Sequence, residues 1–200
     1  MTLVGKTAPE FKLQAFHNGE IKEVSLSDYK GKWVYLLFYP LDFTFVCPTE
    51  VLKFGEMAAE FRNRNCELLG ISVDSQFVHK AWVETDYANG GLGGSLDYAL
   101  LADVKHEVAR DYGVLIEDAG VALRGLFLIN PEGVVVHNVT NFLPVGRSAR
   151  EALRTLKAFQ FVAENDGQVC PADWDEGDET MGASSEGMQK YLEEKHAQSA

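Results

Sequence analysis

Cys47 is the residue of this sequence best placed for nucleophilic chemistry. It follows the apolar run Trp33–Tyr39 and opens the segment Thr49–Asn63, whose apolar residues recur every three or four positions as in an amphipathic helix. A thiol in the first turn of a helix faces unpaired backbone N–H groups and the positive end of the helix dipole, and both favour the thiolate. The alternative is that Cys47 is a small buried apolar residue, since free cysteines are often buried.

The neighbours of Cys47 support a reactive role. Pro48 lacks an N–H and suits the first turn of a helix, so it predicts that the helix starts there. Thr44 lies three residues before Cys47, where its hydroxyl can point at the same space as the sulfur and bond to a bound oxygen. Pro40 can shield that space from water. Together these residues predict a small pocket at the sulfur.

The chain has three cysteines, Cys47, Cys66 and Cys170. They cannot all pair within one chain, so a secreted disulfide scaffold is a poor interpretation. The odd count instead suggests a free, catalytic or intermolecular thiol. Cys66 has no motif around it, and we interpret it as a structural thiol. Cys170 follows the last predicted core helix.

The elements that must position Cys47 form an alternating series. Apolar, β-branched and aromatic runs predict buried strands at Trp33–Tyr39, Leu68–Val73 and Tyr98–Leu101. Helical periodicity and end signals predict helices at Thr49–Asn63, from Asp74 or Ser75 to about Ala88, near Val104–Tyr112 before Gly113, and at Ser148–Ala163. The runs Arg124–Ile129 and Val134–Val139 flank the turn residues 130–133 and predict a hairpin.

This order of elements predicts an α/β fold, a three-layer sandwich with helices on both faces of a mixed sheet, and the thioredoxin fold is its best match. We expect residues 1–165 to form that domain and residues 166–200 to form an extended C-terminal arm. The arm is rich in carboxylates, at Asp173, Asp175, Glu176, Asp178 and Glu179. Its apolar residues are too sparse for a core of their own.

Composition and charge argue against several partners. The chain of 200 residues carries a net charge of −12 and has no basic cluster, which argues against binding nucleic acid or an anionic membrane. Its longest apolar run, Trp33–Leu41, is shorter than the roughly 18 residues of a membrane span. Without a signal-peptide pattern, the cytoplasm is the expected location. The five histidines lack metal-ligand spacing, so we expect no metal and no other cofactor.

Pro40, Thr44 and Cys47 form the pattern Pro-x-x-x-Thr-x-x-Cys, which resembles the active-site motif of the peroxiredoxins. The resemblance covers nearly the whole chain, through residues 8–11, 71–75, 111–114, 124–127, 143–148 and 169–171. Within that family the sequence is similar to typical two-cysteine members of the alkyl hydroperoxide reductase C type.

The resemblance implies a thiol-dependent peroxidase for hydrogen peroxide and alkyl hydroperoxides. Cys47 would be the peroxidatic cysteine, which attacks the terminal peroxide oxygen, becomes a sulfenic acid and releases water or an alcohol. Arg124 matches the family's active-site arginine, although an arginine at a strand end would otherwise be taken as a surface residue. Glu50 and Arg147 match further residues near that site, and Glu50 could hold Arg124 in place.

The resemblance also implies a role for Cys170 as the resolving cysteine of a partner subunit. It would condense with the Cys47 sulfenic acid into an intersubunit disulfide. The alternative, an incidental exposed thiol, is a liability in an inert protein. The expected assembly is a homodimer, which the family joins into a decamer of five dimers, and the expected reductant is thioredoxin or a flavoprotein disulfide reductase.

One feature departs from the family. Residues 90–94 resemble its Gly-Gly-Leu-Gly element, which in members sensitive to over-oxidation accompanies a C-terminal Tyr-Phe that packs over the active-site helix, but this sequence has Tyr191-Leu192. Leucine keeps much of the apolar burial and loses the ring. We therefore expect the tail to detach more readily and the sensitivity to over-oxidation to be intermediate or low.

Three other function classes were compared with the peroxidase. A holdase chaperone is a secondary activity of the family, but a pure holdase has no use for the set Pro40, Thr44, Cys47 and Arg124. A disulfide oxidoreductase of this fold would show C-x-x-C where the sequence has Cys47-Pro-Thr-Glu50. A Cys/His hydrolase needs a histidine beside Cys47, which spacing alone does not exclude.

Overall fold

The structure is a computed structural model that describes residues 2–197. The chain divides into two compact units, Met1–Ala149 and Arg150–Ala200. This division falls at the first residue of the long helix α5 (Ala149–Glu164), whereas we expected a boundary near residue 165. Residues 198–200 of the expected arm lie outside the described residues.

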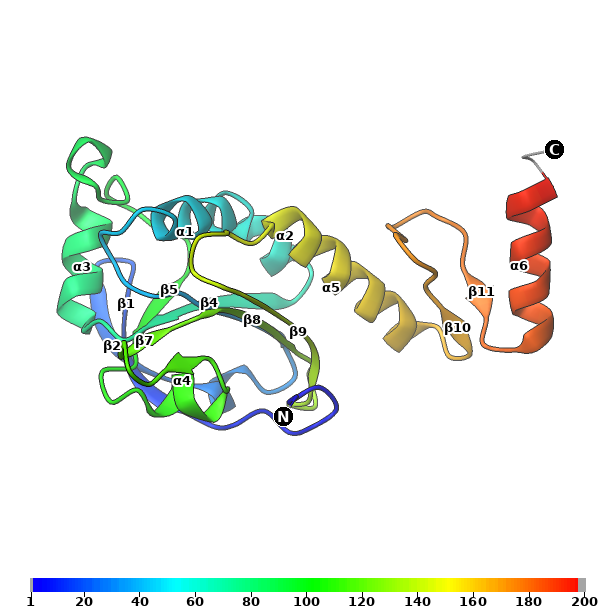
Figure 1. The fold of residues 1–200 in the computed structure, drawn as a ribbon, viewed down its shortest axis with the longest axis horizontal. Helices are drawn as coiled ribbons and strands as arrows, with labels where there is room; N and C mark the ends of the chain where they lie inside the picture. The colour runs from blue at the N-terminus through cyan, green and yellow to red at the C-terminus, as the bar shows by residue number, and fades with distance from the viewer. Residues whose placement is uncertain (1, 198–200) are drawn as a thin grey trace. The chain divides into compact units, whose positions relative to one another are not determined.

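A seven-stranded mixed sheet runs through the first unit (Figure 1), in the order β2-β1-β5-β4-β3-β8-β9. Its strands are β1 Lys12–His17, β2 Glu20–Ser25, β3 Trp33–Phe38, β4 Cys66–Ser72, β5 Ala99–Ala102, β8 Arg124–Ile129 and β9 Val135–Asn141. Strand β4 is parallel to β3 and β5, and the remaining pairs are antiparallel. The sheet is therefore mixed, as the sequence predicts.

Helices cover both faces of this sheet. In Figure 1, α1 and α2 lie above it and α4 lies below it. The helices and short elements of this unit are α1 Cys47–Glu56, α2 Ala58–Asn63, α3 Gln76–Glu84, α4 Glu107–Asp111, the 3-10 turns η1 Leu26–Tyr29 and η2 Tyr87–Asn89, and the short pair β6 Leu115–Ile116 and β7 Val121–Ala122. The three layers confirm the thioredoxin-like sandwich. No helix within residues 2–197 has the length and apolar character of a transmembrane span.

The central strand β3 positions the loop that contains Cys47. All six of its residues are buried, because β3 lies between β4 and β8 and is covered on both faces. Among them, Leu36 and Phe38 belong to the main apolar core. The strand ends at Phe38, and the loop that follows leads directly to Cys47 at the start of α1.

Some elements differ from the sequence expectation. The predicted helix Thr49–Asn63 is two helices, interrupted at Met57, whose backbone has φ −101° and ψ 1°. The apolar spacing continues across this break, so periodicity does not reveal it. The helix predicted near Val104–Tyr112 is the shorter α4, because Asp103 accepts the N–H groups of Val108 and Ala109 and holds the preceding residues in a turn.

The hairpin of β1 and β2 was not predicted. Its turn is Asn18-Gly19, and both residues have positive φ, 51° and 81°. A tight two-residue hairpin turn requires this geometry, and an Asn-Gly pair favours it. The dipeptide was therefore the available sequence signal.

The second unit has more local structure than a bare arm. After α5, strand β10 (Gln168–Val169) pairs with β11 (Met181–Gly182), and helix α6 spans Ser185–Ala197. Between the two strands, the ring of Trp174 packs 5.1 Å from that of Phe161 in α5, and Arg154 donates to the Trp174 carbonyl. This contact ties the acidic segment to α5.

Candidate active site

The structure places Cys47 as the first residue of α1, as the sequence predicts, with Pro48 in the first turn. The N–H groups of Thr49 and Glu50 both point back to the carbonyl of Val46, which confirms that the helix begins here. The side chain of Cys47 is fully buried, at 0% exposure. A sulfur in this position lies at the positive end of the helix dipole and is screened from bulk water.

Arg124 is the polar partner of the Cys47 sulfur. Strand β8 runs antiparallel to β3 with Leu126 opposite Leu37, so the start of β8 lies where β3 ends and the Cys47 loop leaves the sheet. The Nη1 atom of Arg124 lies 3.5 Å from Cys47 Sγ. The same guanidinium donates from Nε to the Leu143 carbonyl at 2.6 Å, which fixes its orientation.

Glu50 joins Arg124 to Arg147. Its Oε2 accepts from Arg124 Nη1 at 2.6 Å, and its Oε1 accepts from the Arg147 backbone N–H and from Arg147 Nε, both at 2.7 Å. Arg147 donates further to Glu50 Oε2 at 3.1 Å and to the Gly125 carbonyl at 2.5 Å. The carboxylate therefore holds both guanidinium groups in the buried space behind the sulfur.

The charge of this cluster is locally positive. Burial by itself would raise the pKa of Glu50, but the hydrogen bonds and charge of Arg147, with the charge of Arg124, outweigh it and leave that pKa lowered. The ionised Glu50 then neutralises one guanidinium of the pair. One positive charge remains to favour a negative sulfur or oxygen at Cys47, inside a chain whose net charge is −12.

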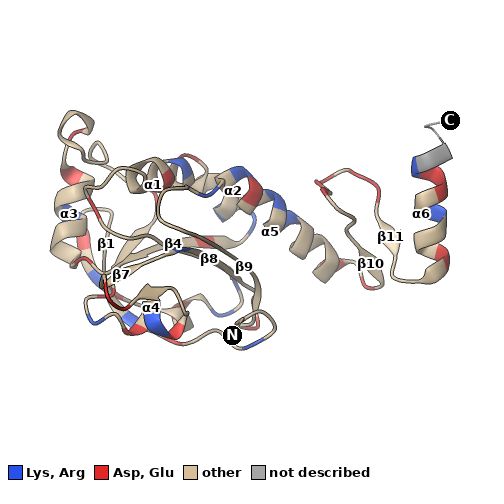
Figure 2. Cartoon of the chain, in the orientation of Figure 1, with Lys and Arg blue, Asp and Glu red and all other residues tan. Residues whose placement is uncertain are grey.

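That local charge is not evident from the distribution of charged residues along the chain. Figure 2 shows Lys and Arg interspersed with Asp and Glu along α4 and α6. Arg124 and Arg147 are instead buried, at 3% and 8% exposure. The basicity of the site therefore comes from buried side chains and not from an exposed basic face.

Thr44 and Pro40 belong to the loop between β3 and α1. Pro40 is buried and Thr44 is half-buried. The Thr44 hydroxyl donates to the Leu41 carbonyl at 2.8 Å, so its hydrogen is used within the loop rather than directed at the sulfur. The Thr44 oxygen can therefore only accept a hydrogen bond from a bound peroxide.

A buried polar network that the sequence did not reveal anchors the same loop. Asp42 Oδ2 lies 2.7 Å from His79 Nδ1 of α3, and His79 Nε2 lies 3.1 Å from the Leu101 carbonyl. Tyr39 donates to the other oxygen of Asp42 at 2.8 Å, and the Asp42 N–H donates to Asp74. Burial raises the pKa of Asp42, an effect that the hydrogen bond and charge of His79 oppose. No spacing rule marks such a set, because its members come from separate elements.

The other two cysteines have different environments. Cys66 opens β4 and is 1% exposed, and burial raises the pKa of its thiol, which fits the predicted structural role. Cys170 is half-buried in the second unit, with its sulfur 3.7 Å from the Ala158 carbonyl. Burial raises the pKa of Cys170 and the charge of Arg154 opposes that shift.

The contacts of His79 bear on a Cys/His hydrolase. Among the described residues Cys47 is bonded to Arg124, while His79, the buried histidine of α3, uses both ring nitrogens on Asp42 and Leu101. A Cys/His pair for hydrolysis is therefore not formed by His79. Within residues 2–197, no group of three or more His, Cys, Asp and Glu side chains is arranged to hold a metal ion.

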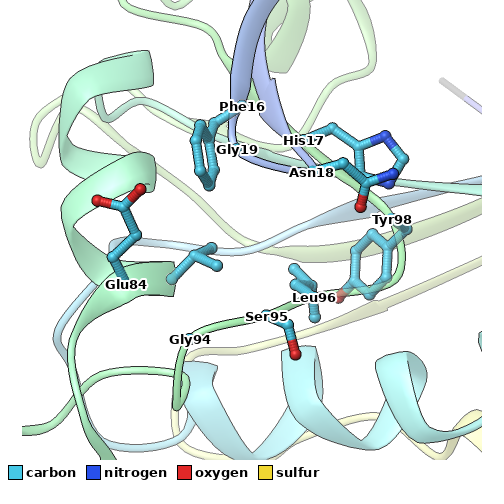
Figure 3. A pocket seen from close by; sticks show the side chains of 10 residues that line it. Phe16, His17, Asn18, Gly19, Glu84, Gly94, Ser95, Leu96 and Tyr98 are labelled. Carbon is cyan, nitrogen blue, oxygen red and sulfur yellow. The ribbon is translucent and has the colours of Figure 1, made fainter.

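A cavity of about 260 Å³ opens elsewhere in the first unit (Figure 3). It is lined by residues of the β1–β2 turn, of α3 and of the loop before β5, among them His17, Glu84 and Ser95. Its lining does not include Cys47, Glu50, Arg124 or Arg147. Cys47 is fully buried and does not open into this cavity.

Comparisons with known proteins agree with this geometry. The sequence model of the AhpC/TSA family matches residues 4–138, and that of the C-terminal domain of 1-Cys peroxiredoxin matches residues 158–194. Peroxiredoxin tpx1 of Schizosaccharomyces pombe is 56% identical over 94% of this chain and 96% of its own length.

Two further relatives extend the comparison. A mitochondrial thioredoxin-dependent peroxide reductase of Mus musculus is 54% identical over 96% of this chain and 74% of its own length. The crystal structure of a reduced 2-Cys peroxiredoxin from Plasmodium vivax superposes with a TM-score of 0.92 at 44% identity, covering 96% of this chain and 99% of that one.

Proposed function

The chain belongs to the AhpC/TSA family, and from that premise we propose that it is a peroxiredoxin that reduces hydrogen peroxide and alkyl hydroperoxides at Cys47. The observation that carries this proposal is the position of Arg124 Nη1, 3.5 Å from the Cys47 sulfur and bonded to Glu50. That arrangement gives a buried nucleophile a fixed positive donor, which a thiol peroxidase requires at the start of its reaction.

The reaction that we propose uses these contacts. The Cys47 thiolate attacks the terminal peroxide oxygen, an S–O bond forms, the O–O bond breaks, and its electron pair leaves with the other oxygen. Arg124, held by Glu50 and by the Leu143 carbonyl, stabilises the negative charge that develops there. After protonation, the leaving oxygen becomes water or an alcohol, and Cys47 becomes a sulfenic acid.

Cys170 of a second copy of the chain resolves this intermediate in our proposal. Its thiol attacks the sulfenic sulfur, a disulfide forms and water leaves. The segment 158–194, which contains Cys170, matches a C-terminal peroxiredoxin domain, and the superposed Plasmodium structure is a 2-Cys enzyme. The mechanism requires a homodimer, and we propose that dimers join further into a decamer.

Thioredoxin is the reductant that we propose for the disulfide. The mouse relative is named as thioredoxin-dependent, and it matches 96% of this chain and 74% of its own length. A flavoprotein disulfide reductase is the alternative. Measuring peroxide turnover with each reductant at equal concentration separates them.

Three variants test the peroxidase. We expect Cys47→Ser to lose peroxide consumption, Cys170→Ser to oxidise once and then stop, and Cys66→Ala to keep the wild-type rate because its thiol is buried away from the site. The measurement is peroxide loss with thioredoxin and its reductase present. Full activity of Cys47→Ser would contradict the mechanism.

Mixing variant subunits tests the pairing. Cys47→Ser and Cys170→Ser chains, exchanged into the same dimers and given one equivalent of peroxide, should form a disulfide-linked dimer on a non-reducing gel. Each variant alone should remain monomeric on that gel. A disulfide confined to one chain would give no linked dimer in the mixture or in the wild type.

A further inference from the structure

The loop between β9 and Arg147 supplies contacts to both arginines of the site. Its Leu143 carbonyl accepts from Arg124 Nε at 2.6 Å. At its other end, the Arg147 backbone N–H donates to Glu50 at 2.7 Å. The conformation of residues 142–146 therefore decides where both contacts are made.

Asn141 stands at the root of this loop. It is the last residue of β9, and in the ladder with β8 its partner is Arg124 itself. Beyond Asn141, the ladder with β8 ends and the chain leaves the sheet. There the Asn141 side chain holds the loop, since its Nδ2 donates hydrogen bonds to the carbonyls of Val145 at 3.1 Å and Gly146 at 3.4 Å.

The peptide unit between Gly146 and Arg147 is consequently held at both ends. Its carbonyl accepts from Asn141 and its N–H donates to Glu50. A peptide unit is planar, so fixing the direction of its carbonyl also fixes the direction of its N–H. Asn141 thereby acts on the position of Glu50 without touching it.

The loop also packs closely on the first turn of α1. A Cβ atom at Gly146 would lie 3.2 Å from Glu50 Cγ and 3.3 Å from Val46 Cγ1, which is tighter than ordinary van der Waals contact. A rotation of this peptide unit would therefore be transmitted to Glu50 and to the residue before Cys47. The loop at Gly146 therefore has little room to move relative to α1.

From these contacts we infer that Asn141 is a positioning residue for the peroxidase reaction, acting through the Gly146–Arg147 peptide on Glu50 and through the Leu143 loop on Arg124. The inference rests on the proposed function. The side-chain N–H groups of Asn141 fix the conformation of the loop, and the loop fixes the positions of the two arginines. Arg124 in turn contacts the reacting atoms. Loss of those N–H groups leaves Cys47 in place and misaligns the donor that the departing oxygen needs.

The test compares two reactions of Cys47 in Asn141→Leu and Asn141→Asp, which remove the N–H donors with little change in size. We expect the second-order rate with hydrogen peroxide in one turnover to fall about tenfold or more, because small displacements of a catalytic donor are costly. The rate of Cys47 alkylation by iodoacetamide should fall much less, since that reaction needs no donor to a departing oxygen. A purely structural role would lower both rates together.

The control is Thr140→Val, at the exposed neighbouring position of β9. It should match the wild type in both reactions. A wild-type peroxide rate in both folded Asn141 variants, or an equal fall in both reactions, would overturn the inference while leaving the proposed function intact. A wild type that does not react with peroxide would overturn both.

Discussion

The guanidinium of Arg124 meets Cys47 and Glu50 through one nitrogen, with Nη1 lying 3.5 Å from the sulfur and 2.6 Å from the carboxylate. A single donor group thus links the Cys47 sulfur to the Glu50 carboxylate. Its Nε donates to the Leu143 carbonyl, so contacts to three different partners fix the orientation of the planar guanidinium. A point charge on a flexible chain could not reproduce this.

Arg124→Lys should therefore be a severe change despite keeping the charge. Lysine lacks the planar fork and cannot meet Leu143, Glu50 and the sulfur together. We expect the single-turnover rate with hydrogen peroxide to fall by about a hundredfold, the scale for losing one charge-stabilising donor. Arg150→Lys, at an exposed position, is the matched control and should react like the wild type. A rate near that of the wild type in Arg124→Lys would refute the role of the fork.

Glu50→Gln should destabilise the fold in a pH-dependent way. Removing this carboxylate leaves two buried guanidinium groups without their shared partner, which costs about 3–5 kcal/mol at neutral pH. The folded-state pKa of Glu50 is lowered, so its stabilisation is complete above the ordinary carboxyl pKa and is lost as the pH falls through the lowered value. Urea unfolding should thus show a gap between variant and wild type that narrows in acid.

The control for that experiment is Glu56→Gln. Glu56 is exposed on the same helix and pairs only with the exposed Lys53 among the described ion pairs. Its substitution should change the unfolding free energy little at any pH, because exposed ion pairs contribute little. A gap for Glu50→Gln that stays constant from neutral to acid pH would show that ionisation of Glu50 is not what stabilises the cluster.

Cys66 should be inert in the native protein. Its side chain is buried and burial raises the pKa of the thiol, so little thiolate forms at neutral pH. We expect iodoacetamide to leave Cys66 unmodified in folded protein and to modify it after unfolding in urea, as read by peptide mass spectrometry. The unfolded sample is the internal control, and rapid labelling of Cys66 in the folded protein would contradict its structural role.

Leu192→Phe should increase over-oxidation of Cys47. Leu192 lies in α6 and is 44% exposed, at the position where sensitive relatives carry a ring. If the tail covers the Cys47 helix as the family resemblance implies, a ring adds about 0.5–1.5 kcal/mol of contact and delays its detachment. The sulfenic acid would then live longer before Cys170 reaches it, and sulfinate per turnover should rise with peroxide concentration.

A substitution one turn away in α6 checks that effect. Met188→Leu is also exposed and apolar, and it should leave the yield of sulfinate at Cys47 unchanged. Wild-type protein that is inactivated as readily as Leu192→Phe would show that Leu192 does not set the sensitivity.

Local signals were sufficient for much of the fold. The runs behind β3, β4 and β8 are rich in apolar residues because nearly all of their positions are buried, so their places in the sequence are readable. The break at Met57 and the short α4 were not, since neither changes the apolar spacing along the chain. The hairpin β1–β2 has a local signal in Asn18-Gly19, whose residue types favour its tight turn.

The sequence by itself marked Cys47 as the candidate nucleophile. Cys47 was marked by its place after a buried strand and in the first turn of a helix, which are local properties of consecutive residues. Arg124, Glu50 and Arg147 were named only through a family pattern, because nothing in their local sequence distinguishes them from surface charges.

Only the tertiary structure decided how those charges combine. Arg124 and Glu50 are brought together by the pairing of β8 with β3, and Arg147 and Asn141 by the loop that leaves β9. The contacts of Glu50 with Arg124 and Arg147 join residues far apart in the chain and form only once the fold brings these side chains within 2.6–2.7 Å. Burial then gives them their strength, since a buried ion pair or hydrogen bond is not screened by water as it would be at the surface where the sequence alone would place it.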